Sequence, residues 1–271
     1  MNFIQQLKNI QKKTNSLLCI GLDTDASKIP SSLRKTKNPQ LEFNKRIIEA
    51  TYDLVCAYKL NLAFYESSNG YETIHQTLEF TTKSIVTIAD GKRGDIGNTA
   101  EQYAKSIFID WKFDAATVNP YMGKDSVAPF IKDEKHCAFL LALTSNPGSK
   151  DFQYLDVKGQ PLYEHVAAKA MRWNTKKNIG LVVGATHPLE LKRIRLMVPD
   201  IPLLIPGIGA QQGDLEKTIR YGCNKGGGLV IINISRGIIY ASSGKDFAKR
   251  AREEAIKIKD QINYFRKEYF G

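Results

Sequence analysis

The chain has 271 residues, which is enough for one large domain or two small ones. Hydrophobic residues make up 42% and charged residues 25%, so a core of normal size can form. The formal net charge of +11 fits either a nucleic-acid-binding protein or an enzyme with a basic surface and an anionic substrate. Acidic residues interrupt the densest basic run, 245–267, which is typical of a solvated helix face, so we expect no nucleic-acid partner.

Short apolar, β-branched runs recur along the chain and alternate with amphipathic segments. The apolar runs predict strands at 17–23, 57–64, 84–90, 115–119, 137–144, 179–185, 202–206 and 229–234. The amphipathic segments predict helices at 41–54, 98–111, 162–173, 188–197 and 211–221. Pro188 fits the first turn of its helix, and Asn98 or Thr99 is a candidate cap for the helix after the third strand. The segment 145–159, rich in Asn, Pro, Gly and Ser, is predicted to be an active-site loop.

Alternation of strands and helices predicts parallel pairing through crossover connections. The strand–helix alternation is repeated eight times within 271 residues. This number of repeats predicts the α/β class and, within it, a (β/α)₈ TIM barrel that forms a single domain over 1–271. An open, doubly wound sheet is the alternative. Polar residues stand at the predicted strand ends, and in a barrel these ends share the rim where catalysis takes place. These residues are Asp23, Asp90, Lys92, Asn119, Thr144, Ser145, Ser235 and Arg236, and Lys59 lies inside the second predicted strand.

Asp90 and Lys92 are two residues apart at the end of the third predicted strand, so their side chains are expected on the same side. Lys59 lies on the neighbouring strand, and Asp95 follows in the next turn. One interpretation is an ion-pair network that ties the rim together. The other is an array of alternating Lys and Asp that keeps Lys92 protonated and sets carboxylate charge against a substrate carboxylate. Charge alone does not separate the two.

The segment 206–213 follows the seventh predicted strand, and its glycines expose backbone N–H groups where a helix begins. Arg236 follows the eighth strand and can offer a forked cation to a phosphate. Because the seventh and eighth loops of this fold commonly form a phosphate site, we predict phosphate binding here. The segment is not a dinucleotide-binding fingerprint, since Gln212 stands where the third glycine would be needed.

The four cysteines, Cys19, Cys56, Cys137 and Cys223, are far apart and form no CxxC pair. We therefore expect neither disulfides nor a zinc site, and the four histidines show no ligand spacing either. No apolar run approaches the roughly 18 residues of a membrane span, and the first residues do not read as a secretory signal. A cytoplasmic protein is expected.

The run Asp90-Gly91-Lys92-Arg93-Gly94-Asp95-Ile96-Gly97-Asn98-Thr99 resembles the third-strand motif of the orotidine 5'-phosphate decarboxylase family, in its longer bacterial (type 2) branch. Order and spacing agree from about residue 17 to 240. The supporting matches are Gly21-Leu22-Asp23, Lys59 with Asn61, Ala63-Phe64-Tyr65-Glu66, Asn119-Pro120-Tyr121, Thr144-Ser145-Asn146-Pro147-Gly148, Pro206-Gly207-Ile208-Gly209-Ala210-Gln211, and Ser235-Arg236.

The resemblance implies conversion of orotidine 5'-phosphate to UMP and CO₂, the last step of de novo UMP synthesis, without metal or organic cofactor. It makes Lys92 the proton donor to C6 of the pyrimidine, with Lys59, Asp90 and Asp95 completing the charged array. It further implies a homodimer in which Asp95 and Thr99 act in the partner's site.

The resemblance also implies the substrate contacts. Asp23 would bind the ribose, Ser145 with Thr144 would read the pyrimidine edge, and Gln211 with Arg236 would hold the phosphate. The remaining candidates for the pocket are Asn61, Ile96, Pro206 and Ser235.

A related barrel enzyme is the alternative: a metal-dependent sugar-phosphate decarboxylase, such as one acting on keto-gulonate phosphate, or an aldolase such as hexulose-phosphate synthase. Such enzymes share an Asp-x-Lys-x-x-Asp pattern. Arg93-Gly94 and the Ser-Asn-Pro-Gly loop favour the nucleotide enzyme. A basic binding protein without activity is a second alternative, but no basic motif interleaved with aromatic residues supports it.

Overall fold

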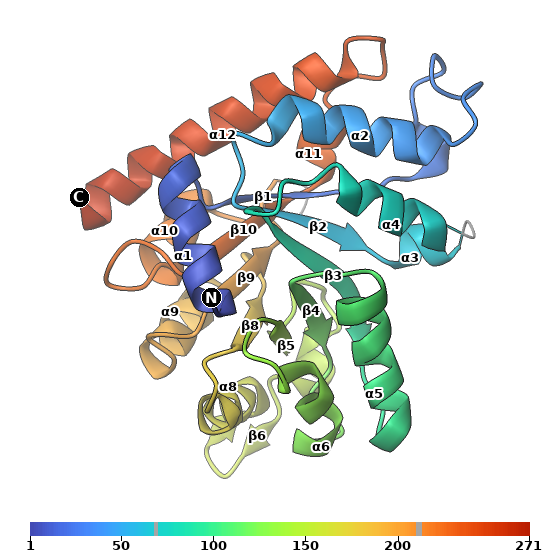
Figure 1. Cartoon of the computed structure of the whole chain (residues 1–271). Coiled ribbons are helices and arrows are strands. Elements are labelled where there is room, and N and C mark those ends of the chain that lie inside the picture. Colours follow the sequence, from blue (N-terminus) through green and yellow to red (C-terminus); the bar gives the residue numbers. More distant parts are fainter. Residues whose placement is uncertain (68–69, 210–212) are drawn as a thin grey trace.

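The computed structural model describes residues 1–67, 70–209 and 213–271. Within these residues, eight parallel strands close into a barrel in the order β1-β10-β9-β8-β5-β4-β3-β2 (Figure 1). This confirms the predicted TIM barrel and excludes the open sheet. The barrel strands are β1 (Leu18–Gly21), β2 (Ala57–Asn61), β3 (Val86–Arg93), β4 (Ala115–Val118), β5 (Cys137–Leu143), β8 (Ile179–Val183), β9 (Leu203–Pro206) and β10 (Val230–Ile234).

Helices surround the barrel and connect its strands (Figure 1). The longer ones are α1 (Phe3–Thr14), α2 (Pro39–Thr51), α4 (Tyr71–Glu79), α5 (Gly97–Lys105), α8 (Leu162–Trp173), α9 (Pro188–Met197), α10 (Leu215–Gly222) and α12 (Phe247–Phe270). The short ones are η1 (Ala26–Lys28), α3 (Ala63–Glu66), η2 (Ser106–Asp110), α6 (Lys124–Val127), η3 (Ala128–Ile131), α7 (Ser149–Phe152) and α11 (Arg236–Ile239). A small antiparallel pair, β6 (Asp156–Val157) and β7 (Gln160–Pro161), lies before α8.

The barrel strands are buried along most of their length, which is why they read as continuous apolar runs in the sequence. At their amino ends, α1 packs across the barrel. The Phe3 ring meets the Phe139 ring edge to face, with centroids 6.0 Å apart, and Gln11 Nε2 donates to the Val230 carbonyl at 2.7 Å. Gly180 has no side chain to collide with the Phe139 ring beside it. Because α1 occupies this end, the carboxyl rim is left for chemistry.

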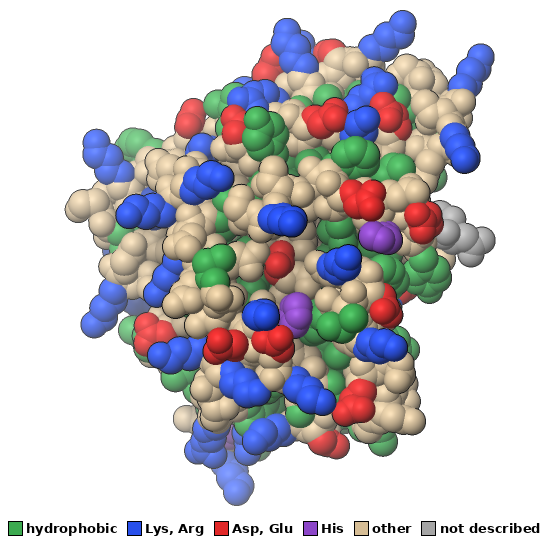
Figure 2. Space-filling model, viewed as in Figure 1, with side chains coloured by type: hydrophobic (Ala, Val, Ile, Leu, Met, Phe, Trp, Pro, Cys, Tyr) green, Lys and Arg blue, Asp and Glu red, His purple; other side chains and the backbone are tan. Residues whose placement is uncertain are grey.

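The C-terminal helix α12 packs against α2 and α10 (Figure 1). Phe247 stacks on Phe43 of α2, with ring centroids 4.9 Å apart. On its outer side Arg250 pairs with Asp246 and Glu253. Lys and Arg side chains are spread among acidic ones over the face in Figure 2, so positive charge is not segregated there.

Several predicted boundaries were wrong for local physical reasons. Strand β2 ends at Asn61 and α3 follows at once, so 62–64 are not strand. The helix predicted at 98–111 begins at Gly97, whose φ of 54° turns the chain directly into the helix, and the cap position is Ile96 rather than Asn98 or Thr99. Its end is the π-helical turn η2. Pro188 does open α9, as predicted.

Two further findings concern the described residues as a whole. All four cysteines are free and buried, in agreement with the expected lack of disulfides. Of the helices described in Figure 1, none has the length and apolar character that a membrane crossing demands.

Candidate active site

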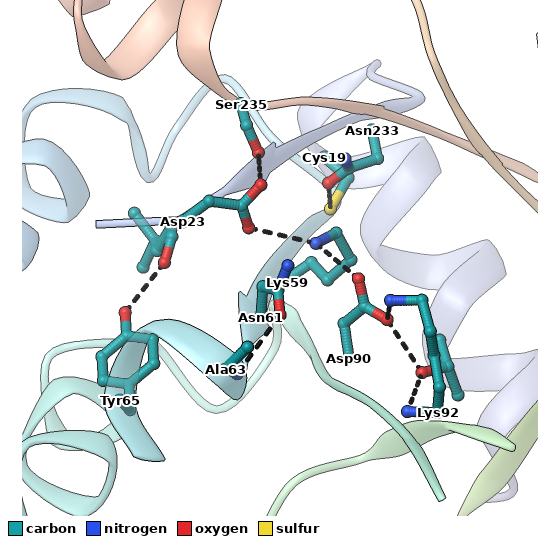
Figure 3. A network of polar contacts seen from close by, with 12 residues as sticks. Cys19, Asp23, Lys59, Asn61, Ala63, Tyr65, Asp90, Lys92, Asn233 and Ser235 are labelled. Carbon is teal, nitrogen blue, oxygen red and sulfur yellow. Dashed lines mark hydrogen bonds and ion pairs between the residues drawn. The ribbon is translucent and has the colours of Figure 1, made fainter. Parts of the chain in front are cut away.

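Charged side chains from the first three strands meet at the carboxyl rim of the barrel (Figure 3). Lys59 on β2 lies between two carboxylates: its Nζ is 2.9 Å from Asp90 Oδ2 and 3.2 Å from Asp23 Oδ1. Lys59 is 3% exposed, so its ammonium group is largely removed from water and is stabilised by these two carboxylates instead. The predicted cluster of Lys59 and Asp90 therefore exists, and Asp23 joins it.

Electrostatics keep Lys59 and Asp90 ionised. Burial alone lowers the pKa of Lys59, but the carboxylates of Asp90 and Asp23 outweigh burial and raise that pKa above its ordinary value. Burial alone raises the pKa of Asp90, but the ammonium groups of Lys59 and Lys92 outweigh it and hold that pKa well below the usual range. Around neutral pH, Lys59 is thus a cation and Asp90 an anion.

Lys92 stands at the end of β3 with its Nζ 2.8 Å from Asp90 Oδ1. Its side chain is 51% exposed, in contrast to the buried Lys59. Its backbone has a φ of 46°, a left-handed conformation that residues other than glycine seldom adopt. Asp90 and Lys92 lie together as predicted, but by way of this unusual backbone rather than a regular strand.

Asp23 follows β1 and is also fixed from the neighbouring strand β10, on the side of β1 away from β2. Its Oδ2 accepts a hydrogen bond of 2.7 Å from Ser235 Oγ, just after β10. This contact requires glycine at position 21, because a Cβ there would lie 1.9 Å from the same Ser235 oxygen. Gly21 and Ser235 were matched as separate motifs in the sequence, and the structure shows that each depends on the other.

A cavity of about 160 Å³ opens beside the cluster. Predicted residues from the first, second, third, seventh and eighth barrel strands, or the loops after them, share its wall. Its lining residues are Asp23, Lys59, Asn61, Asp90, Pro206, Gly207, Ile208, Asn233, Ile234, Ser235, Arg236 and Gly237. Gly207 has a φ of 104°, so the turn after β9 needs glycine there. Gln211, predicted to hold phosphate, lies outside the described residues.

Thr144 and Ser145 follow β5 and occupy the next part of the same rim. The Thr144 amide donates to Gln153 Oε1 at 2.7 Å, and its carbonyl oxygen is 3.0 Å from His187 Nε2. A Cβ at Gly184 would lie within 2.9 Å of the Ser145 backbone, so the loops after β5 and β8 touch here. These two residues are not part of the cavity wall described above.

Asp95, Ile96 and Thr99 lie apart from the cluster. They occupy the β3–α5 connection and the first turn of α5, and none of them lines the cavity. Asp95 Oδ1 accepts from the Ile96 amide, and the Ile96 side chain is 56% exposed. Within this chain alone the predicted array is therefore Lys59, Asp90 and Lys92, with Asp23 as the additional carboxylate.

Sequence reasoning missed several residues that support the site. Thr117 on β4 contacts both Asp90 and Lys92, and Asn233 on β10 lines the cavity above Cys19. The available signal was a polar residue inside an otherwise apolar strand, in each case on the face that points into the barrel. His187 contacts the backbone of the β5 loop.

Chemically, the rim offers one exposed ammonium group, a buried ion pair beside it and, across the cavity, a guanidinium next to a glycine turn. Such a site suits an anionic substrate. The ammonium group could deliver a proton to one end of it, and the guanidinium could bind the other end. Among the described residues, no group of three or more His, Cys, Asp or Glu side chains could hold a metal ion.

Comparison with known proteins agrees with this arrangement. Residues 16–251 match the model of the "Orotidine 5'-phosphate decarboxylase / HUMPS family". The chain is 50% identical over 275 residues to an orotidine 5'-phosphate decarboxylase from Dehalococcoides mccartyi, covering 99% of this chain and 100% of the relative. It is 48% identical to the enzyme of that name from Flavobacterium johnsoniae, over 95% and 96% of the two chains.

Solved structures give the same result. The OMP decarboxylase of Leishmania donovani superposes with a TM-score of 0.86 at 38% identity, covering 98% of this chain and 99% of that one. The UMP synthase of the same organism superposes with a TM-score of 0.88 at 39% identity, and there the match covers 57% of the longer chain. Fold, motif and full-length identity thus agree, and the chain belongs to the orotidine 5'-phosphate decarboxylase / HUMPS family.

Proposed function

We propose that this protein converts orotidine 5'-phosphate to UMP and CO₂ in the cytoplasm, as a single barrel domain and as the last step of de novo UMP synthesis. The chain is an enzyme of the carboxy-lyase class, like the relatives named above. The observation that carries the proposal is the ordered set Asp23–Lys59–Asp90–Lys92, in which Lys92 is the exposed member and contacts Asp90 of the cavity wall.

The proposed chemistry uses Lys92 as the acid. The bond between C6 and the carboxyl carbon breaks, CO₂ leaves, and the electron pair that remains on C6 takes a proton from the Lys92 ammonium group. Asp90, held anionic by two lysines, binds that ammonium group and keeps it in place. Its negative charge also disfavours a second carboxylate close by, which makes loss of the substrate carboxylate more favourable.

The phosphate supplies binding energy at a distance from C6. Arg236 and the Gly207 turn line the same cavity as the cluster, and they are proposed to bind the phosphate together with Gln211. Asp23 and Asn61 are proposed to face the ribose, and Thr144 with Ser145 the pyrimidine edge. Binding energy gained at the phosphate is useful when it fixes the reacting carbon beside Lys92.

A homodimer is part of the proposal. Asp95, Ile96 and Thr99 lie away from the cavity of their own chain, and Ile96 presents an apolar side chain to solvent. Exposed apolar side chains continue along this side of the rim at Tyr121, Met122 and Phe152. A second copy covering this surface would bring Asp95 and Thr99 to the neighbouring site, where Asp95 would complete the array.

A direct assay tests the activity. The purified protein is mixed with orotidine 5'-phosphate, and the loss of substrate absorbance is followed with and without a chelator. We expect turnover that the chelator leaves unchanged. Turnover that requires added Mg²⁺, or activity on a sugar phosphate in place of the nucleotide, would instead support the metal-dependent branch of the family.

A further inference from the structure

Strand β3 is irregular at the point where it carries the reacting groups. Its pairing with β4 is regular up to Ala89, opposite Ala116, and resumes only at Arg93, opposite Val118. Three residues, 90–92, thus stand where the partner strand offers one, which is a β-bulge. A bulge takes backbone groups out of the ladder, and a buried N–H without a partner is costly.

Thr117 is the β4 residue opposite this bulge, and it is 2% exposed. Its Oγ1 accepts a hydrogen bond of 2.9 Å from the backbone N–H of Lys92, in place of the lost ladder bond. The same hydroxyl donates its hydrogen to Asp90 Oδ1 at 2.9 Å. That Asp90 oxygen also accepts from Lys92 Nζ at 2.8 Å. One hydroxyl therefore links the backbone of Lys92 to the carboxylate that binds its side chain.

We propose that Thr117 is a positioning residue for the decarboxylation: it holds Lys92 in its left-handed backbone conformation and fixes the Asp90 carboxylate, so that the ammonium group stays aimed at the substrate. This inference rests on the proposed function for its kinetic consequences. The geometric part does not, because the hydrogen bond to the Lys92 amide is a property of the folded chain itself.

The test compares Thr117→Val, which keeps the shape but loses the hydroxyl, with Thr117→Ser, which keeps the hydroxyl. We expect kcat of Thr117→Val to fall roughly 10- to 100-fold, as for a reacting group displaced by about 1 Å. Its affinity for UMP should stay close to that of the wild type, since Thr117 does not line the cavity. Thr117→Ser should recover most of kcat. If Thr117→Val does not fold, Thr117→Ala takes its place.

Thr87, on the neighbouring strand β3, supplies a matched control. Thr87 is 5% exposed. Its hydroxyl donates a hydrogen bond to Asp114 Oδ2 at 2.9 Å and accepts one from the Asp114 backbone amide at 3.2 Å. Thr87→Val thus removes the same type of hydroxyl from the amino end of β3. We expect it to lose stability but to keep kcat. The proposal is overturned if Thr117→Val keeps kcat within about threefold of the wild type, or if Thr87→Val loses as much.

Hydrogen exchange separates this inference from the proposed function. The Lys92 amide should be protected in the wild type and in Thr117→Ser, and should exchange faster in Thr117→Val. If the wild type does not turn over orotidine 5'-phosphate, the proposed function fails while this measurement still decides the role of Thr117. Unchanged protection in Thr117→Val overturns the inference whatever the activity.

Discussion

At the scale of single residues, two lysines of one cluster have different surroundings. Lys59 is enclosed by two carboxylates, whereas Lys92 shares one carboxylate and leaves half of its side chain exposed. The sequence placed Lys59 inside one strand and Lys92 at the end of the next, and it left open whether they form a structural network or a reactive array. Their exposure supports different proposed roles: the buried lysine would balance charge, and the exposed one would reach a ligand.

Lys92→Ala should abolish turnover, because it removes the proposed proton donor. General-acid groups commonly contribute about 10²- to 10⁴-fold, so we expect a fall of at least that order. UMP binding, measured by calorimetry, should persist, since the cavity wall stays intact. Lys112→Ala is the control: Lys112 also has a left-handed backbone, with a φ of 65°, but lies before β4 at the other end of the barrel. Turnover like that of the wild type in Lys92→Ala would contradict the assignment.

The depressed pKa of Asp90 predicts how stability depends on pH. A carboxyl group whose pKa is lower in the folded than in the unfolded chain stabilises the fold above its unfolded pKa, about 3.9. That stabilisation is lost as the pH falls through the folded pKa. In urea unfolding, the difference in free energy of unfolding between the wild type and Asp90→Asn should therefore be constant from pH 5 to about 8 and shrink below about pH 4. A difference that is equally large at pH 3 and pH 6 would rule this out.

At the scale of elements, the repeating pattern of strands and helices predicted the barrel, because hydrophobic periodicity is local information. The bulge in β3, the early start of α3 and the π-helical turn η2 were not predicted, since each depends on contacts between strands or helices distant in sequence. For the same reason Thr117 was missed: its importance comes from the register of β4 against β3, which no single segment encodes.

The contact between the β5 and β8 loops gives a prediction at this scale. Gly184→Ala would place a Cβ 2.8 Å from the Ser145 amide nitrogen, and neighbouring backbone atoms have to move to admit it. If Ser145 reads the pyrimidine, KM for orotidine 5'-phosphate should rise roughly tenfold, as for a binding loop displaced by a fraction of an ångström to 1 Å. Gly226→Ala, whose Cβ would meet only the Asn224 side chain at 3.7 Å, is the control. Equal KM values for the two variants would show that the Ser145 loop does not contact substrate.

At the scale of the whole molecule, the rim collects ionic groups on one side and exposed apolar groups on another. The ionic groups lie on, or directly after, β10, β1, β2 and β3. These four strands are consecutive neighbours in the closed barrel. The apolar groups follow β3, β4 and β5. Asp95 and Thr99, which the family motif assigns to a shared site, flank the exposed Ile96 in the chain, and the proposed second copy would complete the site at this place.

Mixing two inactive variants tests whether sites are shared. In a mixed dimer of Lys92→Ala with Asp95→Ala, one site receives Lys92 from one chain and Asp95 from the other and is intact. With random exchange, half of the dimers are mixed and half of their sites are intact, so roughly one quarter of wild-type activity should return. Subunit exchange is checked by mass spectrometry of a labelled chain. Exchange without recovery would mean that each chain completes its own site.

The left-handed backbone of Lys92 also bears on how this protein can evolve. Such a conformation costs a residue with a Cβ about 1–2 kcal/mol, and glycine or asparagine adopts it with less strain. This strain alone favours glycine or asparagine at position 92, whereas the proposed role of Lys92 as proton donor requires the lysine. The backbone strain and the proposed catalytic role thus make opposite demands on this position, so stabilising substitutions are better sought elsewhere, for example on the exposed face of α12.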